Sequence, residues 1–337
     1  MSSISNKLTA CLGIDFPMIM APMFLVSNKD MMLEAMRSGI AGAFPTLNFR
    51  KTGELATLLD ELNRIKDSGV RGTYGVNLIV QRSNPYFSSH LEVCLSKKVP
   101  FYITSLGDPT EVISGAKKYG AKVFCDVTNL RHALKCANAG CDGFIAVGQG
   151  AGGHAGPFPL QVLVPALKGQ FPDRMIIAAG GIANGAGILS ALTLGADGVS
   201  IGTRFIASTE AGVNDAYKKA VVNSAMEDIV LTEKLSGTPC TIINTDEAHK
   251  MGYKQNWFQR FLSNNKRTKK WFKALIQLRG FRRLEESVMP NNYKRLWCAG
   301  QSVELIHEIL PCSEIISRLR AETVNSSNNL LKLFTAD

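Results

Sequence analysis

Eight short apolar runs, each starting 21 to 33 residues after the one before, constrain the fold of this chain more than any other feature. The runs are rich in β-branched residues and do not alternate with polar ones, as is typical of strands covered on both faces. They therefore predict eight buried parallel strands, at residues 17–21, 40–45, 73–78, 101–106, 122–127, 143–148, 175–180 and 198–203.

Helical patterns lie between these runs, and several end at a glycine, the residue favoured just after a helix. Clear examples span 28–39, 52–69, 129–140 and 184–195, and Ser27 is the expected N-cap of the first. Strands that alternate with helices indicate parallel βαβ units. Eight such units predict an α/β fold, a (β/α)8 TIM barrel. A doubly wound sheet is the alternative, and the count of eight disfavours it.

Glycine turns follow both the seventh and the eighth predicted strands, in "AAGGIANG" and "SIGTRF". The loops after these two strands commonly hold a phosphate in TIM barrels. Gly180, Gly181, Gly202 and Thr203 would bring backbone N–H groups to it, and the helix after the seventh strand would add its positive N-terminus. Either turn alone could be a simple tight turn, but the two together favour phosphate binding.

The loop after the sixth predicted strand reads "VGQGAGGHAGP" (147–157) and packs five glycines around one histidine. Because glycine lacks a Cβ, this loop could lie close to a flat ligand, with His154 standing over it. The alternative is a structural histidine bonded to loop carbonyls, but the position at a strand end favours function. A structural role is expected for the histidines in or beside helical patterns, which are His90, His132, His249 and His307.

Other strand ends would contribute amides and apolar side chains to the same mouth. Asn77 and Ser105 lie near the ends of the third and fourth runs, while "MAPM" and "CDVTN" stand at the ends of the first and fifth. There is no cluster of carboxylates, so no metal site is expected. No Ser-His-Asp or Cys-His order is apparent. A mouth of this kind beside a phosphate site favours a planar redox cofactor with a phosphate, and FMN fits best.

Together these segments resemble the nitronate monooxygenase family, formerly called 2-nitropropane dioxygenases, with its FMN-dependent enoyl-ACP reductase relatives. The resemblance covers about residues 13–245 and resumes at 296–306. It is carried by "IMAPMFLVS", "GVNLIV", "DVTN", "AGGHAG", "AAGGIANG", "GADGVSIGTRFIAS" with Glu210 following, and "DIVLTEKLSGTPC". The glycine-flanked histidine, the GG turn and the GTRF turn, in this order, make it specific.

The resemblance implies an FMN-dependent oxidoreductase that takes an alkyl nitronate or nitroalkane and O2 and releases a carbonyl compound and nitrite. His154 matches the family's active-site histidine, a base or an orienting group beside the nitro group. Met23 and its neighbours would line the flavin ring, Asn77 would bond to it, and the glycine turns would hold the phosphate. The residues expected at the cofactor are Ala21, Pro22, Met23, Asn77, Asp126, Gly152, Gly153, Gly180, Gly181, Gly202, Thr203 and Gln301.

The chain departs from the better-studied members in both motifs around the mouth. Gly150 stands where they have a glutamate shortly before the histidine motif, and Val147 where they often have a glutamine. The late motif reads "GQSVE", with Ser302 and Glu304 in place of small residues. NAD(P)H-dependent enoyl-ACP reductases and quinone reductases use the same barrel and histidine, so these activities stay open as alternatives. A non-catalytic binding protein is the least favoured.

The net charge of +10 comes from one segment, since Ala248 to Leu284 holds eleven Lys and Arg and no Asp or Glu. Aromatic and aliphatic pairs within 257–276 predict short amphipathic helices, favoured as a lid with solvated charges. The alternative is an acidic partner at 248–284, such as an acyl carrier protein, a nucleotide phosphate or an anionic membrane surface. No nucleic-acid recognition motif is present, and no such partner is expected.

The sequence thus predicts an FMN-binding barrel (1–215), a small helical lid or substrate domain (216–295) and a C-terminal return to the barrel (296–337). The eight cysteines form no C-x-x-C pair and are expected to be reduced thiols. No signal peptide and no run of about 18 apolar residues is found, so a cytoplasmic protein is expected. A small-molecule substrate is the expected partner, and a homodimer is an open alternative for the assembly.

Overall fold

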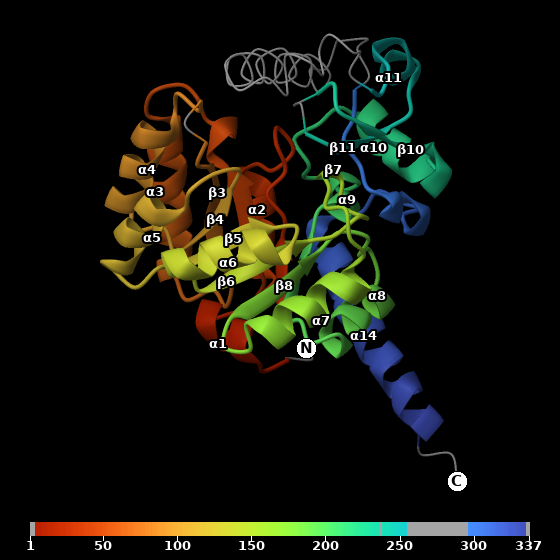
Figure 1. Cartoon of the computed structure of the whole chain (residues 1–337), viewed down its shortest axis with the longest axis horizontal. Helices are drawn as coiled ribbons and strands as arrows, with labels where there is room; N and C mark the ends of the chain where they lie inside the picture. The colour runs from red at the N-terminus through yellow and green to blue at the C-terminus, as the bar shows by residue number, and fades with distance from the viewer. Residues whose placement is uncertain (1–3, 82, 236–237, 255–295, 335–337) are drawn as a thin grey trace.

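The protein is built around a closed barrel of parallel strands (Figure 1). The structure is a computed structural model that describes residues 4–81, 83–235, 238–254 and 296–334. Each of the eight predicted runs coincides with one barrel strand to within a few residues, so the (β/α)8 barrel is confirmed. In barrel order the strands are β1 (Met18–Met20), β2 (Ala41–Pro45), β3 (Thr73–Ile79), β4 (Phe101–Ser105), β5 (Lys122–Val127), β6 (Gly143–Val147), β8 (Met175–Ala179) and β9 (Gly198–Ile201).

A layer of helices surrounds the barrel. The first begins one residue later than predicted, because the side chain of Asn28, not of Ser27, accepts the N–H of Met31 (3.0 Å). The helices between consecutive barrel strands are α2 (Lys29–Arg37), α3 (Glu54–Asp67), α4 (Phe87–Ser96), α5 (Thr110–Lys117), α6 (Leu130–Ala139), α7 (Leu160–Gln170) and α8 (Gly185–Thr193), with a short 3-10 turn, η1 (Thr46–Asn48), before α3.

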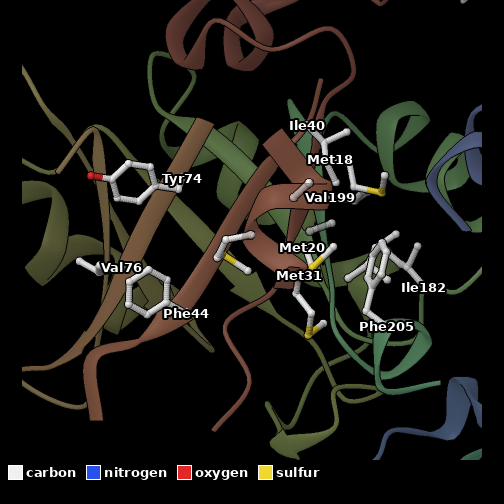
Figure 2. Packing of buried hydrophobic residues seen from close by; sticks show 14 of the residues in the cluster. Met18, Met20, Met31, Ile40, Phe44, Tyr74, Val76, Ile182, Val199 and Phe205 are labelled. Carbon is white, nitrogen blue, oxygen red and sulfur yellow. The ribbon is translucent and has the colours of Figure 1, made fainter. Parts of the chain in front are cut away.

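Apolar side chains fill both sides of the strands. Inside the barrel Phe101 and Phe124 meet edge to face, with ring centroids 6.1 Å apart. Leu8 of α1 (Lys7–Leu12) belongs to this inner cluster and closes the N-terminal end of the barrel. Between strands and helices lies a larger cluster that includes Phe44 and Tyr74 (Figure 2). The barrel interior is therefore a packed core and not a pore.

One glycine inside the barrel offers a test of this packing. A Cβ at Gly75 would lie 2.5 Å from the ring of Phe101, so Gly75→Ala is expected to destabilise the fold by about 1–3 kcal/mol through overpacking. Gly169 in α7 is the control, because its Cβ would meet nothing within 4 Å and alanine favours a helix. Urea unfolding of both variants measures the difference, and equal free energies of unfolding would contradict the packing described here.

The C-terminal helix α14 (Cys312–Phe334) occupies the place of an eighth barrel helix. After β9 the chain forms only the short α9 (Thr203–Ile206) and then leaves the barrel. α14 packs against both α8 and α2 (Figure 1). Arg320 donates to the carbonyl of Ser38 (2.5 Å), and Glu322 accepts the N–H of Gly185 (2.8 Å). The helical layer is thus completed by residues from the far end of the sequence.

A second, smaller sheet lies beyond the carboxyl ends of the barrel strands, at the end opposite α1 (Figure 1). It consists of β10 (Ile229–Thr232), β11 (Cys240–Ile243) and β7 (Gly153–His154), and it is accompanied by α10 (Asp215–Asn223) and α11 (Asp246–Met251). The part expected as a helical lid or substrate domain (216–295) thus contains two strands as well as helices among its described residues. β10 and β11 are only four residues long, too short for a periodic pattern that would predict them from the sequence. They are stabilised by pairing with each other.

The basic segment is only partly visible. Residues 255–284, which carry most of its charge and its expected helices, lie outside the described residues, so its acidic partner and its lid role stay predictions. No helix in the described ranges has the length and apolarity needed to cross a membrane. None of the eight cysteines forms a disulfide, as the sequence predicts, although the sulfurs of Cys240 and Cys298 lie 3.9 Å apart.

Candidate active site at the barrel mouth

Three polar side chains line the inner face of the barrel mouth on consecutive strands. Successive residues of a strand point to opposite faces, and Gly75 faces the interior ring of Phe101, so Asn77 also points inward. The amide of Asn77 donates to Ser105 Oγ (2.7 Å), and Ser105 Oγ donates to Asp126 Oδ2 (2.5 Å). The structure thus brings two predicted cofactor residues together through a serine that the sequence placed only at a strand end.

Asp126 is held in an unusual environment for a carboxyl group. Burial raises its pKa to about 6, and the hydrogen bond from Ser105 opposes part of that rise. Among the described residues no charged group contributes to the shift. Asp126 therefore titrates close to physiological pH, inside the mouth of the barrel.

The segment after β1 forms one wall of the mouth. Ala21 donates its N–H to Ile201 O (2.8 Å), and the N–H of Met23 is held by Ser27 Oγ (2.9 Å). These bonds place the Met23 sulfur 3.7 Å from where a Cβ of Gly202 would stand. The segment from Ala21 to Met23 therefore lies beside the turn after β9, and its contact with a cofactor stays a prediction.

Glycines from three distant segments pack on one another beside this wall. Gly181 donates to the carbonyl of Gly150 (2.9 Å), and a Cβ on Gly180 would lie 2.7 Å from Ala151 N. A Cβ on Gly152 would lie 2.8 Å from the N–H nitrogen of Gly300. The absence of side chains at these glycines thus allows backbone segments of the protein itself to pack closely against one another. A contact of Gly152, Gly153 or Gly180 with a cofactor stays a prediction.

Gly181 and Gly202 differ from these packed glycines because they leave space. The nearest heavy atom to a Cβ on Gly181 is 3.8 Å away, and at Gly202 the nearest is the Ala21 Cβ at 3.6 Å. Gly181 also has φ +75°, which side chains rarely adopt. Thr203, next to Gly202, accepts from the N–H of Gly300 (3.1 Å), the residue just before Gln301. These two turns therefore leave open space at the mouth, although the N–H of Gly181 is donated to Gly150, and their contact with a phosphate stays a prediction.

The N-terminus of α8, expected to add its positive end to the phosphate site, has two of its first N–H groups bonded within the protein. The side chain of Asn184 accepts the N–H of Gly187 (2.9 Å), and Glu322 accepts that of Gly185. These groups therefore already have partners within the protein. The bond to Gly185 comes from α14 and joins residues 137 positions apart, so no local sequence pattern could predict it.

His154 lies at the rim of the mouth on a strand, not on a free loop. It belongs to β7, which pairs with β11 so that His154 lies opposite Cys240. Thr241 of β11 donates to Ala151 O (2.5 Å) and fixes the loop before the histidine. Burial by the surrounding protein lowers the pKa of His154, although the side chain reaches solvent. The imidazole is therefore neutral at pH 7 and able to accept a proton.

The motif departures have structural explanations. A Cβ on Gly150 would lie 2.9 Å from Gly181 Cα, so this packing leaves no room for the glutamate of the better-studied enzymes. Glu304 accepts the N–H of Met226 (2.9 Å) and so joins the C-terminal return to the segment just before β10. Glu210 accepts the N–H of Cys312 (2.9 Å) at the start of α14. These acidic residues hold segments together and do not belong to the mouth.

The other histidines lie in or beside helices. His90 in α4 is buried, stacks on Tyr86 with centroids 5.4 Å apart, and has a pKa lowered by burial. The Nδ1 of His132 lies 3.3 Å from the side chain of Asn129, the N-cap of α6. Their places fit the structural role expected of them.

A TIM barrel with open glycine turns after its last two strands and a neutral histidine at the mouth defines a class of enzymes that bind a phosphorylated cofactor. The sequence model of the family described as nitronate monooxygenase matches residues 63–322, which is more than half of the chain. The protein belongs to this family. It is a family of oxidoreductases whose cofactor is FMN.

Similar proteins point to more than one substrate. The chain is 28% identical to a probable nitronate monooxygenase of Staphylococcus aureus over 71% of its length and 78% of that protein. It is 24% identical to a hydroxy-methyl-oxo-octahydroindene-carboxyl-CoA dehydrogenase of Rhodococcus jostii, over 96% and 97% of the two chains. The structure of FabK from Thermotoga maritima is similar with a TM-score of 0.83 and 29% identity, over 98% and 100% of the chains.

Proposed function

We propose that the protein oxidises alkyl nitronates with O2, using FMN. Two nitronate ions and one O2 give two carbonyl compounds and two nitrite ions, which balances oxygen and charge. Family membership supports this activity, and the neutral histidine at the rim of a mouth with open phosphate turns is the structural observation that carries it.

The residues of the mouth fit FMN. A phosphate needs N–H groups that a ligand can approach, and Gly202 leaves space where a side chain would stand. Gly181 leaves similar space, but its own N–H is donated to the carbonyl of Gly150, so at that turn we propose only the room for the phosphate. Met23 would line one face of the ring, and the inward amide of Asn77 would bond to its edge. When bound, FMN supplies the capacity to accept electrons and to react with O2.

His154 would serve the substrate. Because burial lowers its pKa, the ring is uncharged at pH 7 and can take the α-proton of a neutral nitroalkane. A nitronate has already lost that proton, so toward this substrate the histidine would only orient the nitro group. We therefore propose that His154 is the catalytic base for neutral nitroalkanes.

A thioester-linked substrate is the second candidate. Two of the relatives that match nearly the whole chain are named as a carboxyl-CoA dehydrogenase and as FabK. In addition, the packing around Gly150 excludes the glutamate found in the better-studied nitronate enzymes. On this alternative the protein would be an NAD(P)H-dependent reductase of an enoyl thioester, or of a quinone.

Aerobic turnover distinguishes the two candidates. With propane-2-nitronate we expect acetone and nitrite in equal amounts and oxygen uptake that depends on bound FMN. With NAD(P)H and crotonyl-CoA we expect consumption of NAD(P)H no faster than in the absence of the thioester. Nitrite release no faster than with free FMN, together with thioester-dependent NAD(P)H oxidation, would overturn the proposed activity.

A further inference from the structure

The chain of hydrogen bonds from Asn77 to Asp126 has a defined direction. Asn77 Nδ2 donates to the carbonyl of Ile103 (3.2 Å) and to Ser105 Oγ (2.7 Å), so both of its hydrogens are engaged. Ser105 has a single hydroxyl proton, which it donates to Asp126 Oδ2 (2.5 Å). The three side chains belong to the adjacent strands β3, β4 and β5 and form a row across the inner face of the mouth.

An ionised carboxylate fixes this direction because it can only accept hydrogen bonds. Ser105 must then point its proton at Asp126 and offer a lone pair to Asn77. The amide of Asn77 must in turn present its NH2 group to the serine. Among the described residues no group donates to Asn77 Oδ1, so the carbonyl oxygen is the part of this amide left for a ligand.

We infer that Asp126 is a positioning residue that acts through Ser105 to hold the Asn77 amide with its oxygen toward the cofactor. This inference rests on the FMN site at the barrel mouth. An acceptor at this position pairs with an N–H group of a flavin ring and is repelled by the ring carbonyls. Asp126 therefore does not need to touch the cofactor in order to decide how the cofactor is held.

Protonation of Asp126 would release this constraint. A carboxylic acid donates its own proton to Ser105, and the serine proton is then free to point elsewhere. Because burial raises the pKa of Asp126 to about 6, the fixed state exists above about pH 6 and is lost as the pH falls below it. The titratable group that interacts electrostatically with Asp126 is the Cys136 thiol of α6, whose pKa is raised. Asp108 also acts on this thiol, and its carboxylate accepts from Thr110 at the start of α5.

The first test follows FMN binding with pH. We expect Asp126→Asn to bind FMN about fivefold more weakly than wild type at pH 7.5, the value of one hydrogen bond of about 1 kcal/mol. Between pH 7.5 and 5.5 the affinity of wild type should fall about two- to threefold further than that of Asp126→Asn or Ser105→Ala, because about a quarter of Asp126 is still ionised at pH 5.5. The phosphate of FMN itself titrates near pH 6, but this contribution is common to all the proteins and cancels in the comparison.

Asp142→Asn is the matched control. Asp142 precedes β6, at the opposite end of the barrel from the mouth, and accepts the N–H of Val123 (2.9 Å). It should keep the pH profile of wild type, which shows that loss of a carboxylate alone is not the cause. Parallel profiles for wild type, Asp126→Asn and Ser105→Ala would overturn the inference.

A second measurement needs no cofactor and separates this inference from the FMN site. In the apoprotein we expect the side-chain amide signals of Asn77, observed by NMR, to shift with a midpoint near pH 6. This midpoint should vanish in Asp126→Asn and in Ser105→Ala. If it persists in Ser105→Ala, or is absent from wild type, the serine does not couple the two groups, whether or not FMN binds.

Discussion

Gly202→Asp is expected to purify without bound FMN, while Gly202→Ala keeps it. The space at Gly202 admits a Cβ at ordinary contact distance, 3.6 Å from Ala21 and 3.7 Å from the Met23 sulfur, and φ is −110°. The fold should therefore tolerate either side chain. A carboxylate about 4 Å from the phosphate costs about 4 kcal/mol at an effective dielectric constant of 20. The affinity for FMN should fall by about 10²–10³-fold.

The ratio of flavin to protein after purification and titration of the apoprotein with FMN measure this loss. Gly202→Ala controls for the added atoms, and thermal unfolding shows that both variants fold. If Gly202→Asp retains FMN as tightly as Gly202→Ala, the phosphate is not held at this turn.

His154→Ala should lose about 10²–10⁴-fold in rate on a neutral nitroalkane, the usual contribution of a general base. The loss on preformed nitronate should be much smaller, because no proton has to be removed. FMN should remain bound, since His154 lies at the rim of the mouth on β7. Steady-state rates with 2-nitropropane and with its nitronate measure the two losses.

The pH dependence gives an independent readout of the same role. The pKa of His154 is lowered from its usual value, so the base is protonated and inactive only at acidic pH. The rate on neutral nitroalkane should rise with pH below 6.5 and then level off in wild type, and this rise should be missing in His154→Ala. Equal losses on both substrates would instead mean that the histidine orients or stabilises charge and removes no proton.

The barrel could be predicted from the sequence because its strands are local features. Each of the eight apolar runs is short, buried on both faces and followed by a turn, and each coincides with a strand to within a few residues. The ends of some helices could also be predicted. In α6 the side chain of Asn129 caps the first turn, and Gly140 ends the helix in a left-handed conformation that glycine favours. Such signals depend on a few neighbouring residues, so no knowledge of the tertiary structure was needed.

The rest depends on contacts between distant residues. A strand of two residues such as β7 has no periodicity, and it exists because Gly153 and His154 pair with Thr241 and Cys240. In the same way, nothing near α8 indicates that Glu322 will satisfy its first N–H group. These contacts determine where His154 lies and which turns remain open. The sequence therefore predicted which residues form the candidate site but not how they are arranged.

The hydrogen-bonded row at the mouth could be predicted in part. Alternation along β3, β4 and β5 would have placed Asn77, Ser105 and Asp126 on the inner face. The stagger of neighbouring strands, which brings Ser105 opposite Ile79, came only with the structure. The serine was therefore passed over as a partner of the two residues that the sequence had assigned to the cofactor.

Anaerobic mixing of the purified yellow protein with propane-2-nitronate or with NAD(P)H tests the proposed activity most directly. Without O2 the electrons taken from a substrate stay on the bound flavin and bleach its colour. We expect nitronate to bleach the protein and NAD(P)H to leave it yellow, with the colour returning when O2 is admitted. Bleaching by NAD(P)H and none by nitronate would contradict the account and assign the protein to the reductases of its family.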